Sequence, residues 1–338
     1  MNHNALLIPL LLAASLPLCG CNKAGKLNER STTQPPAGPV EFKLKWPQGE
    51  RVEQDFNLKM QSDLAIPGQP APMHQDMTMG FAYGLTVLAA NPDGTHEIEM
   101  DFLSSRMQMS MAGKTLADYD STRKTDAEEK PVPGGVSFGK LFGKMIGAKI
   151  HYFLDASNGV DRIEGVDELM NRVSAGANPQ ELMTMKSMLN EGYFKQMMSA
   201  NLMLPTKPVQ PGDTWSVQLE FPMGPMGTMT MNYDFTFQNW ELHGKRSCAR
   251  LTFQGDVTSK PDPAANAGAM SMTIQDGTIS GISWFDPELG ITIDTTANQN
   301  LNLILQMSIP GAPGQAPKVQ TMTNEMQQSM TIKLGSVK

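Results

Sequence analysis

The chain has 338 residues, with 27 basic and 34 acidic side chains, a formal net charge of −7 and 40% hydrophobic residues. This apolar content is too high, and the net charge too small, for a chain that is disordered throughout. An acidic chain without a basic run repels the phosphates of nucleic acids, so nucleic-acid binding is disfavoured. The length suffices for about two domains or one large β-rich unit.

The first 20 residues contain no Asp, Glu, Lys or Arg, and residues 5–18 form an almost unbroken apolar run. A transmembrane helix needs about 20 apolar residues, so this run is too short to cross a bilayer comfortably. A short apolar run that ends in small residues is typical of an export signal. We therefore predict that residues 1–20 are a signal peptide.

The run ends in Leu18-Cys19-Gly20-Cys21, which resembles the lipobox of bacterial lipoproteins. The resemblance implies that Cys21 carries the lipid and becomes the new N-terminus, so that the protein is anchored in the cell envelope and faces the periplasm. Asn22, in place of an aspartate, weakly favours the outer membrane. Residues 21–40 are rich in Pro, Ser, Thr and Gln and are predicted to form a flexible tether.

The three cysteines have different fates under this interpretation. Cys19 leaves with the signal peptide and the sulfur of Cys21 is blocked by lipid, so Cys248 is the only free thiol of the mature chain. No internal disulfide is then possible, and the core alone must stabilise the protein. Cys248 lies in a strand-like segment and is interpreted as a small buried hydrophobic residue rather than a nucleophile.

Strict alternation of apolar and polar residues dominates the sequence after the tether and predicts strands with one buried face. One apolar face consists of Met229, Met231, Tyr233, Phe235 and Phe237. Residues 291–307 alternate in the same way, and neutral Asn, Gln, Thr and Ser are expected on the solvent faces. The predicted fold class is α+β with mainly antiparallel strands.

Four features occur twice in the same order and suggest an internal duplication. They are a glycine before a strand (Gly49, Gly212), a Met-Thr-Met block (77–79, 229–231), a following turn (91–94, 243–244) and an Asp-x-x-x-Gly turn (155–159, 286–290). We predict a first β-rich unit at 41–165 and a second at 208–338, as two duplicated curved, half-barrel-like sheets. The alternative is chance, because any two amphipathic strands align tolerably.

Three segments have helical periodicity. Residues 166–174 and 179–203 lie in a predicted helical connector, 166–207, between the two β-rich units, and residues 137–146 form a third candidate. Pro179 after Asn178 suits a helix start. Amphipathic helices of this kind can cover one face of a curved sheet.

No catalytic or metal-binding pattern is complete. Residues 134–141 lack the final hydroxyl of a phosphate-binding loop, and His96-Glu97 lacks the second histidine of a zinc-protease helix. Residues 155–161 place glycine one position early for a calcium loop and are interpreted as a hairpin turn. We therefore expect neither an enzyme nor a cofactor.

The 27 methionines raise one sharper alternative, because M-x-M pairs can bind Cu(I) through their thioethers. The pairs include residues 107, 109 and 111. The simpler interpretation is that M-x-M in a strand directs both side chains to one buried face, and few histidines accompany them. Methionine also suits adaptable apolar linings that accept varied ligands.

The segment Lys207-Pro208-Val209, followed by Pro211-Gly212-Asp213-Thr214-Trp215, together with the Phe285–Gly290 turn, resembles a family of bacterial envelope lipoproteins that supplies no known activity. A looser analogy of architecture links the chain to periplasmic lipoprotein carriers and lipid-binding lipoproteins. Function does not follow from such an analogy alone.

The leading hypothesis is a membrane-anchored lipoprotein that binds an apolar ligand, such as a lipid or an acylated protein. The hypothetical lining residues are Met77, Met79, Phe81, Met107, Met109, Met111, Met229, Met231, Tyr233 and Phe235. The alternative is a structural or assembly lipoprotein with filled sheets that acts through protein contacts, and Cu(I) handling is a minor alternative.

Overall fold

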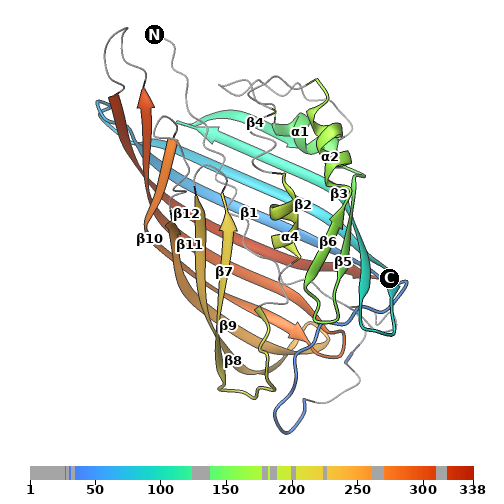
Figure 1. Cartoon of the computed structure of the whole chain (residues 1–338). Coiled ribbons are helices and arrows are strands. Elements are labelled where there is room, and N and C mark those ends of the chain that lie inside the picture. The colour runs from blue at the N-terminus through green and yellow to red at the C-terminus, as the bar shows by residue number, and fades with distance from the viewer. Residues whose placement is uncertain are drawn as a thin grey trace.

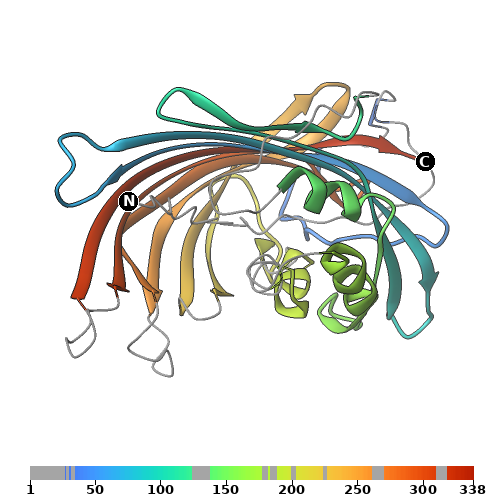
Figure 2. The same cartoon turned by 90° about the horizontal axis from the view of Figure 1, so that it is seen from above.

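The computed structural model describes residues 27, 30–31, 35–123, 138–176, 182, 189–198, 203–223, 227–260, 270–309 and 318–338. The predicted signal peptide and Cys21 lie outside these residues. Within them, twelve strands form a single curved sheet, and helices lie against its concave side (Figures 1 and 2). The mainly antiparallel prediction is confirmed, because every strand pair in the sheet is antiparallel.

The strands fall into two sets along the chain. The first set is β1 (Arg51–Ala65), β2 (Met73–Ala90), β3 (His96–Met111), β4 (Lys114–Asp120), β5 (Lys149–Leu154) and β6 (Val160–Glu164). The second set is β7 (Thr214–Pro222), β8 (Thr228–His243), β9 (Arg246–Lys260), β10 (Met270–Asp286), β11 (Ile291–Ile309) and β12 (Lys318–Val337). The helices are α1 (Phe138–Met145), α2 (Val166–Ser174) and α4 (Glu191–Met197).

The sheet order is β6-β5-β3-β2-β1-β12-β11-β10-β9-β8-β7, with β4 paired only to β3. The expectation of two separate sheets was therefore wrong: β1 and β12 pair from Val52↔Val337 to Ala65↔Thr323 and join both halves. This pairing satisfies two rows of backbone groups that two separate sheets would expose as edges. The strand order ends at β6 on one side and at β7 on the other.

The sequence matches lie at corresponding places in the two halves. Gly49 and Gly212 precede β1 and β7 with φ of 84° and 97°, a left-handed conformation that glycine adopts at little cost. The Met-Thr-Met blocks lie in β2 and β8, the second strand of each half. If β4 is not counted, each Asp-x-x-x-Gly turn is the fourth connection between consecutive strands of its half, β5–β6 in the first and β10–β11 in the second. The duplication itself stays a prediction.

Alternation builds the buried face. In β1, Val52, Leu58 and Met60 are buried, whereas Asp55 and Lys59 on the other face are exposed. The register carries this alternation across the sheet, because inward residues pair with inward residues on each neighbouring strand. Leu58, for example, lies opposite Met79 in β2 and Met330 in β12.

The helices identify the buried face as the concave one (Figure 2). The ring of Phe142 in α1 packs edge-on against Phe81 of β2, with centroids 5.1 Å apart. α2 has the predicted bounds and buries Leu169 and Val173. α4 lies within the predicted helix 179–203, most of which falls outside the described residues, and buries Phe194.

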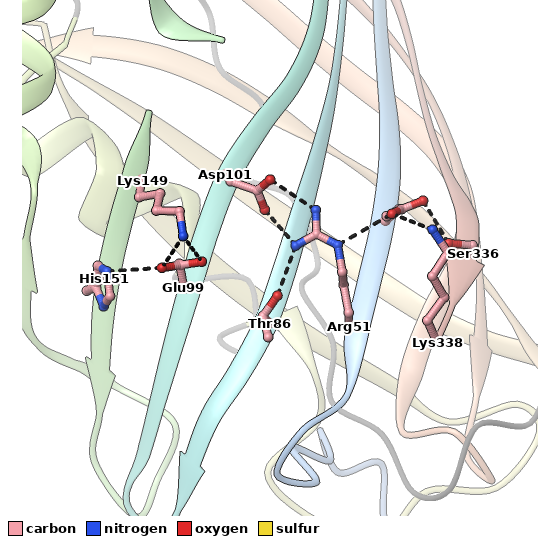
Figure 3. A network of polar contacts seen from close by, with 9 residues as sticks. Arg51, Thr86, Glu99, Asp101, Lys149, His151, Ser336 and Lys338 are labelled. Carbon is pink, nitrogen blue, oxygen red and sulfur yellow. Dashed lines mark hydrogen bonds and ion pairs between the residues drawn. The ribbon is translucent and has the colours of Figure 1, made fainter. Parts of the chain in front are cut away.

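Polar side chains on the convex face link neighbouring strands (Figure 3). Arg51 donates to both carboxylate oxygens of Asp101 at 2.7 and 3.0 Å and to Thr86 Oγ1 at 2.9 Å. The pKa of Arg51 is raised, chiefly by its hydrogen bond to Asp101. Lys338 Nζ bonds Glu53 at 2.8 Å and lowers the pKa of that carboxyl. These contacts tie β3, β2, β1 and the chain end together on the outer surface.

The segment before β1 crosses one end of the second half. Val40 forms a bridge with Val209, and Phe42 is buried against Phe237 and Phe285. Lys45 Nζ donates to the carbonyl oxygens of Pro287 and Glu288 at 2.7 and 3.0 Å. Part of the chain that precedes the sheet is thus bonded to the β10–β11 turn.

Candidate functional site

All ten predicted lining residues lie on the concave face of the sheet. Across β2 and β3, Met77 lies opposite Met109, and Met79 lies opposite Met107. The buried ones are Met79, Met107, Met109, Met229, Met231, Tyr233 and Phe235. Three are half-buried, namely Met77, Phe81 and Met111.

The structure does not bring these residues into one site. One group lies on β2 and β3, and the other lies on β8. Five strands separate β2 from β8 in the sheet order, namely β1, β12, β11, β10 and β9. Because each half carries its own Met-Thr-Met block, the pattern that looked like one lining marks the same position in two halves of a wide sheet.

A cavity of about 30 Å³ lies on the concave face of the second half. Its walls are mainly apolar, and of the ten predicted residues only Tyr233 and Phe235 contribute to them. The lining residues are Met203, Leu204, Tyr233, Phe235, Leu251, Phe253, Ile279, Ser283, Thr292, Thr295, Ala297 and Met330. This volume holds one or two water molecules, so the concave face is largely filled at this point.

Aromatic rings form the wall of this cavity on the β7–β9 side. The rings of Phe235 and Phe253 lie 5.3 Å apart, and Trp215 stacks on Phe235 with centroids 5.4 Å apart. The Trp215 indole N–H donates to the carbonyl oxygen of Met203 at 2.9 Å, which ties the end of the connector to β7.

Several polar side chains are buried on the concave face, contrary to the expectation that neutral polar residues occupy the solvent faces. Gln54 accepts a hydrogen bond from the Tyr83 hydroxyl at 2.7 Å, and the hydroxyls of Ser283 and Thr295 lie 2.9 Å apart. Gln299 and Gln328 lie directly opposite one another on β11 and β12. Gln299 is only 4% exposed, yet its Nε2 has no hydrogen-bond partner among the described residues.

The sequence contained a signal for these amides. Gln299 lies between Ala297 and Leu301 in the alternating inward series, and Gln328 lies between Met326 and Met330. Strict alternation therefore places both amides inward. The predicted lining omitted both amides because it included methionines and aromatic residues alone.

A short helix bridges the two end strands of the sheet. β6 and β7 end the strand order on opposite sides, and α4 contacts both of them. Phe194 in α4 is fully buried, and burial raises the pKa of the neighbouring Tyr193 to about 12. We call this region, formed by β6, α4 and β7, the open side of the sheet.

An acidic cleft of about 770 Å³ lies on the β6 flank of the open side. Its walls come from the end of β6, the start of α2 and residues 189–191. Four carboxylates line it, those of Glu164, Asp167, Glu168 and Glu191. Glu164 forms an ion pair with Arg162, so the negative potential of the cleft, which repels anions, comes mainly from Asp167, Glu168 and Glu191.

The other candidate groups have structural roles. The Asp155 carboxylate accepts hydrogen bonds from the backbone of Ser157 and Gly159 at 2.8 Å, as in a hairpin turn. Cys248 is fully buried, and burial raises the pKa of its thiol strongly.

Within the described ranges, no group of three or more His, Cys, Asp or Glu side chains is placed to hold a metal ion. No helix among the described residues is long and apolar enough to cross a bilayer.

A family model described as a family of unknown function (DUF6263) matches residues 93–292, more than half of the chain. No curated protein matches the sequence.

Solved structures show weak similarity. Lipovitellin shares 11% identity over 86% of this chain, at a TM-score of 0.38, and the chain covers only 26% of lipovitellin. A protein from Bacteroides fragilis, described as exported with a YmcC-like fold, shares 11% identity over 88% of this chain and 100% of its own length, at a TM-score of 0.28. A lipoprotein-sorting domain from Vibrio parahaemolyticus shares 8% identity over 84% of each chain, at 0.13. TM-scores this low do not establish a common fold or function.

Proposed function

Since this chain belongs to the family of unknown function DUF6263, we infer its role from its own geometry and propose that it binds apolar molecules on the concave face of its sheet without catalysing a reaction. The observation that carries the proposal is the open side. The apolar face continues across the strands, but the sheet does not close, and α4 bridges β6 and β7. Apolar concave surfaces with few polar groups are typical ligand sites.

Ligand binding requires the protein to open, because the cavity of about 30 Å³ is far smaller than a ligand pocket, which has a volume of roughly 300–1,000 Å³. α4 has only seven residues, and isolated helices of this length are marginal in water. Its displacement from β6 and β7 would open a path to the Met-lined and aromatic face. Methionine side chains then adapt their rotamers to the ligand.

The proposal predicts lipid in the purified protein. Native mass spectrometry after gentle extraction should find a co-purifying apolar molecule, and the delipidated protein should enhance the fluorescence of N-phenyl-1-naphthylamine. Phe194→Ala removes the buried ring of α4 and should speed dye uptake. Leu242→Ala is the control, because Leu242 is 75% exposed and lies near the end of β8. If neither the native protein nor Phe194→Ala binds dye or lipid, the proposal is wrong.

A second candidate function is structural, through contacts with partner proteins. The observation that favours it is the filling of the concave face, where Met79, Met109 and Met231 are at most 2% exposed. The same dye experiment separates the two functions, since a permanently filled sheet takes up no dye even when α4 is loosened. Cu(I) handling stays a minor prediction, tested by metal content after replacement of Met107, Met109 and Met111.

We also propose attachment to the cell envelope through lipid on Cys21. The support is the lipobox-like segment, because Cys21 itself lies outside the described residues. Cys21→Ser should move the protein from the membrane fraction to the soluble fraction. Persistence of the variant in the membrane fraction would contradict the anchor.

A further inference from the structure

The concave face contains a polar group that its own structure leaves unused. Gln299 is 4% exposed and its Nε2 donor lacks a partner among the described residues. A buried donor without an acceptor costs about 1–3 kcal/mol, so native proteins seldom retain one without a use. Its neighbour Gln328 directs its own Nε2 to Met326 Sδ at 3.0 Å, so Gln328 is partnered.

The unused donor lies beside the cavity. Ile279 is opposite Gln299 on β10, and Ala297 precedes Gln299 by two residues on the same face of β11. Both line the cavity, as does Met330, two residues beyond Gln328. The opposite wall is formed by the aromatic rings of Tyr233, Phe235 and Phe253. The result is a mainly apolar cavity, with the hydroxyls of Ser283, Thr292 and Thr295 also in its lining, next to the amide donor of Gln299.

A ligand group that pairs with this donor must be a hydrogen-bond acceptor. The charge of the surroundings decides between charged and uncharged acceptors. Carboxylates and phosphates are acceptors, but an anion pays a large desolvation cost next to a neutral amide on an apolar face. The carboxylates of the acidic cleft, which flanks the open side, also repel anions. An uncharged carbonyl accepts a hydrogen bond without either penalty.

From this juxtaposition we propose that the concave face of the second half binds neutral fatty acyl esters, with the ester carbonyl accepting a hydrogen bond from Gln299 Nε2 and the hydrocarbon chain against Tyr233, Phe235 and Phe253. This inference rests on the proposed apolar-ligand function and names the ligand class. Binding forms and breaks no covalent bond.

Three probes of equal chain length test the inference by displacement of bound N-phenyl-1-naphthylamine from the full chain at pH 7. They are methyl laurate, lauric acid and dodecane. Methyl laurate should displace the dye at the lowest concentration. Gln299→Met keeps the side-chain volume but removes the donor, and it should weaken methyl laurate about fivefold while dodecane is unchanged. Gln306→Met is the control, because Gln306 lies on the exposed face of the same strand.

The outcomes separate the two proposals. If the dye itself does not bind, the apolar-ligand function fails. If the dye binds but no probe displaces it, only the ester inference fails. If dodecane binds but methyl laurate binds no better, or if Gln299→Met leaves methyl laurate unchanged, only the ester inference fails. Equal binding of lauric acid and methyl laurate would overturn the neutral class. A urea unfolding curve checks folding, and Gln299→Met should be as stable as the native chain because it removes an unpartnered donor.

Discussion

The fourth turn of each half contains an Asp-x-x-x-Gly sequence, but the two turns have very different surroundings. Asp155 is exposed, and its carboxylate accepts hydrogen bonds from Ser157 and Gly159 of its own turn, which hold the pKa of this carboxyl below its usual value. Asp286 is fully buried and also accepts a hydrogen bond from Arg246 Nε at 2.5 Å.

The second turn is therefore a point of tertiary attachment. Arg246 is itself only 2% exposed and also lies 3.4 Å from Glu288. Burial acts to lower the pKa of Arg246, but the hydrogen bond and charge of Asp286 outweigh it and raise the pKa. Lys45 adds hydrogen bonds from the segment before β1. The same local sequence thus forms a simple hairpin in one half and an anchor in the other.

Replacing the carboxylates of these turns should give the largest difference between the halves. Asp286→Asn removes the buried carboxylate next to Arg246 and leaves the partly exposed Glu288, 3.4 Å away, as its acidic neighbour, so the free energy of unfolding should fall by about 3 kcal/mol. Asp155→Asn keeps an acceptor in an exposed turn and should cost less than about 1 kcal/mol. Urea unfolding of both variants measures the difference. Equal losses would show that the buried pair contributes no more than a local turn.

Methionines in the two halves should differ by a smaller amount. Met231→Ala empties a fully buried position and removes the acceptor of the Tyr233 hydroxyl, which lies 3.2 Å from Met231 Sδ. It should cost about 3 kcal/mol. Met111→Ala, at a half-buried position near the end of β3, should cost about 1 kcal/mol. Thermal unfolding monitored by circular dichroism tests this ranking, which a larger loss for Met111→Ala would reverse.

The link from the segment before β1 to the second turn should have a moderate effect. Lys45→Met removes two hydrogen bonds to carbonyl oxygens and should lower the free energy of unfolding by about 1.5 kcal/mol. Lys43→Met is the matched control, since the Lys43–Glu41 ion pair is exposed and such pairs contribute about 0–1 kcal/mol. Urea unfolding of the two variants tests this prediction. Equal midpoint urea concentrations would show that the hydrogen bonds of Lys45 contribute no more to stability than the exposed ion pair of Lys43.

The smallest effect concerns His74 on the exposed β1–β2 hairpin of the first half. Its hydrogen bond to Asp63, 2.8 Å long, raises the pKa of His74 above its ordinary value, and Asp76 adds to the shift. The protonated pair stabilises the hairpin below the unfolded pKa, and this contribution is lost as the pH rises through the folded pKa. NMR titration should find the raised pKa, and Asp63→Asn should lower it. An unchanged pKa in Asp63→Asn would exclude this cause.

Alternation in the sequence was sufficient to predict many strands and their inward residues. The alternating segment 229–237 lies in β8 and the segment 291–307 lies in β11, and α2 has the predicted bounds. These predictions succeed because a period of two, or a helical period, is a local property of the chain. The same local reasoning placed all ten lining residues on one face but could not show that β2 and β8 lie far apart.

The candidate site required the fold. Gln299 was within reach of strict alternation, but its missing partner and the neighbouring cavity depend on side chains from β10, β11 and β12. Likewise, the open side exists because β6 and β7 fail to pair while α4 contacts both. Neither feature has a sequence pattern of its own.

By itself, the sequence determined the strand-rich class, the inward face of the alternating strands and the local turns, because hydrophobic periodicity and glycine conformations act over a few residues. Only the tertiary structure decided that two predicted sheets are one, that Asp286 is buried while Asp155 is not, and that Gln299 Nε2 has no hydrogen-bond partner among the described residues. These features depend on the pairing of β1 with β12 and on segments more than two hundred residues apart, such as Lys45 and Glu288. Contacts at such separations leave no local pattern in the sequence.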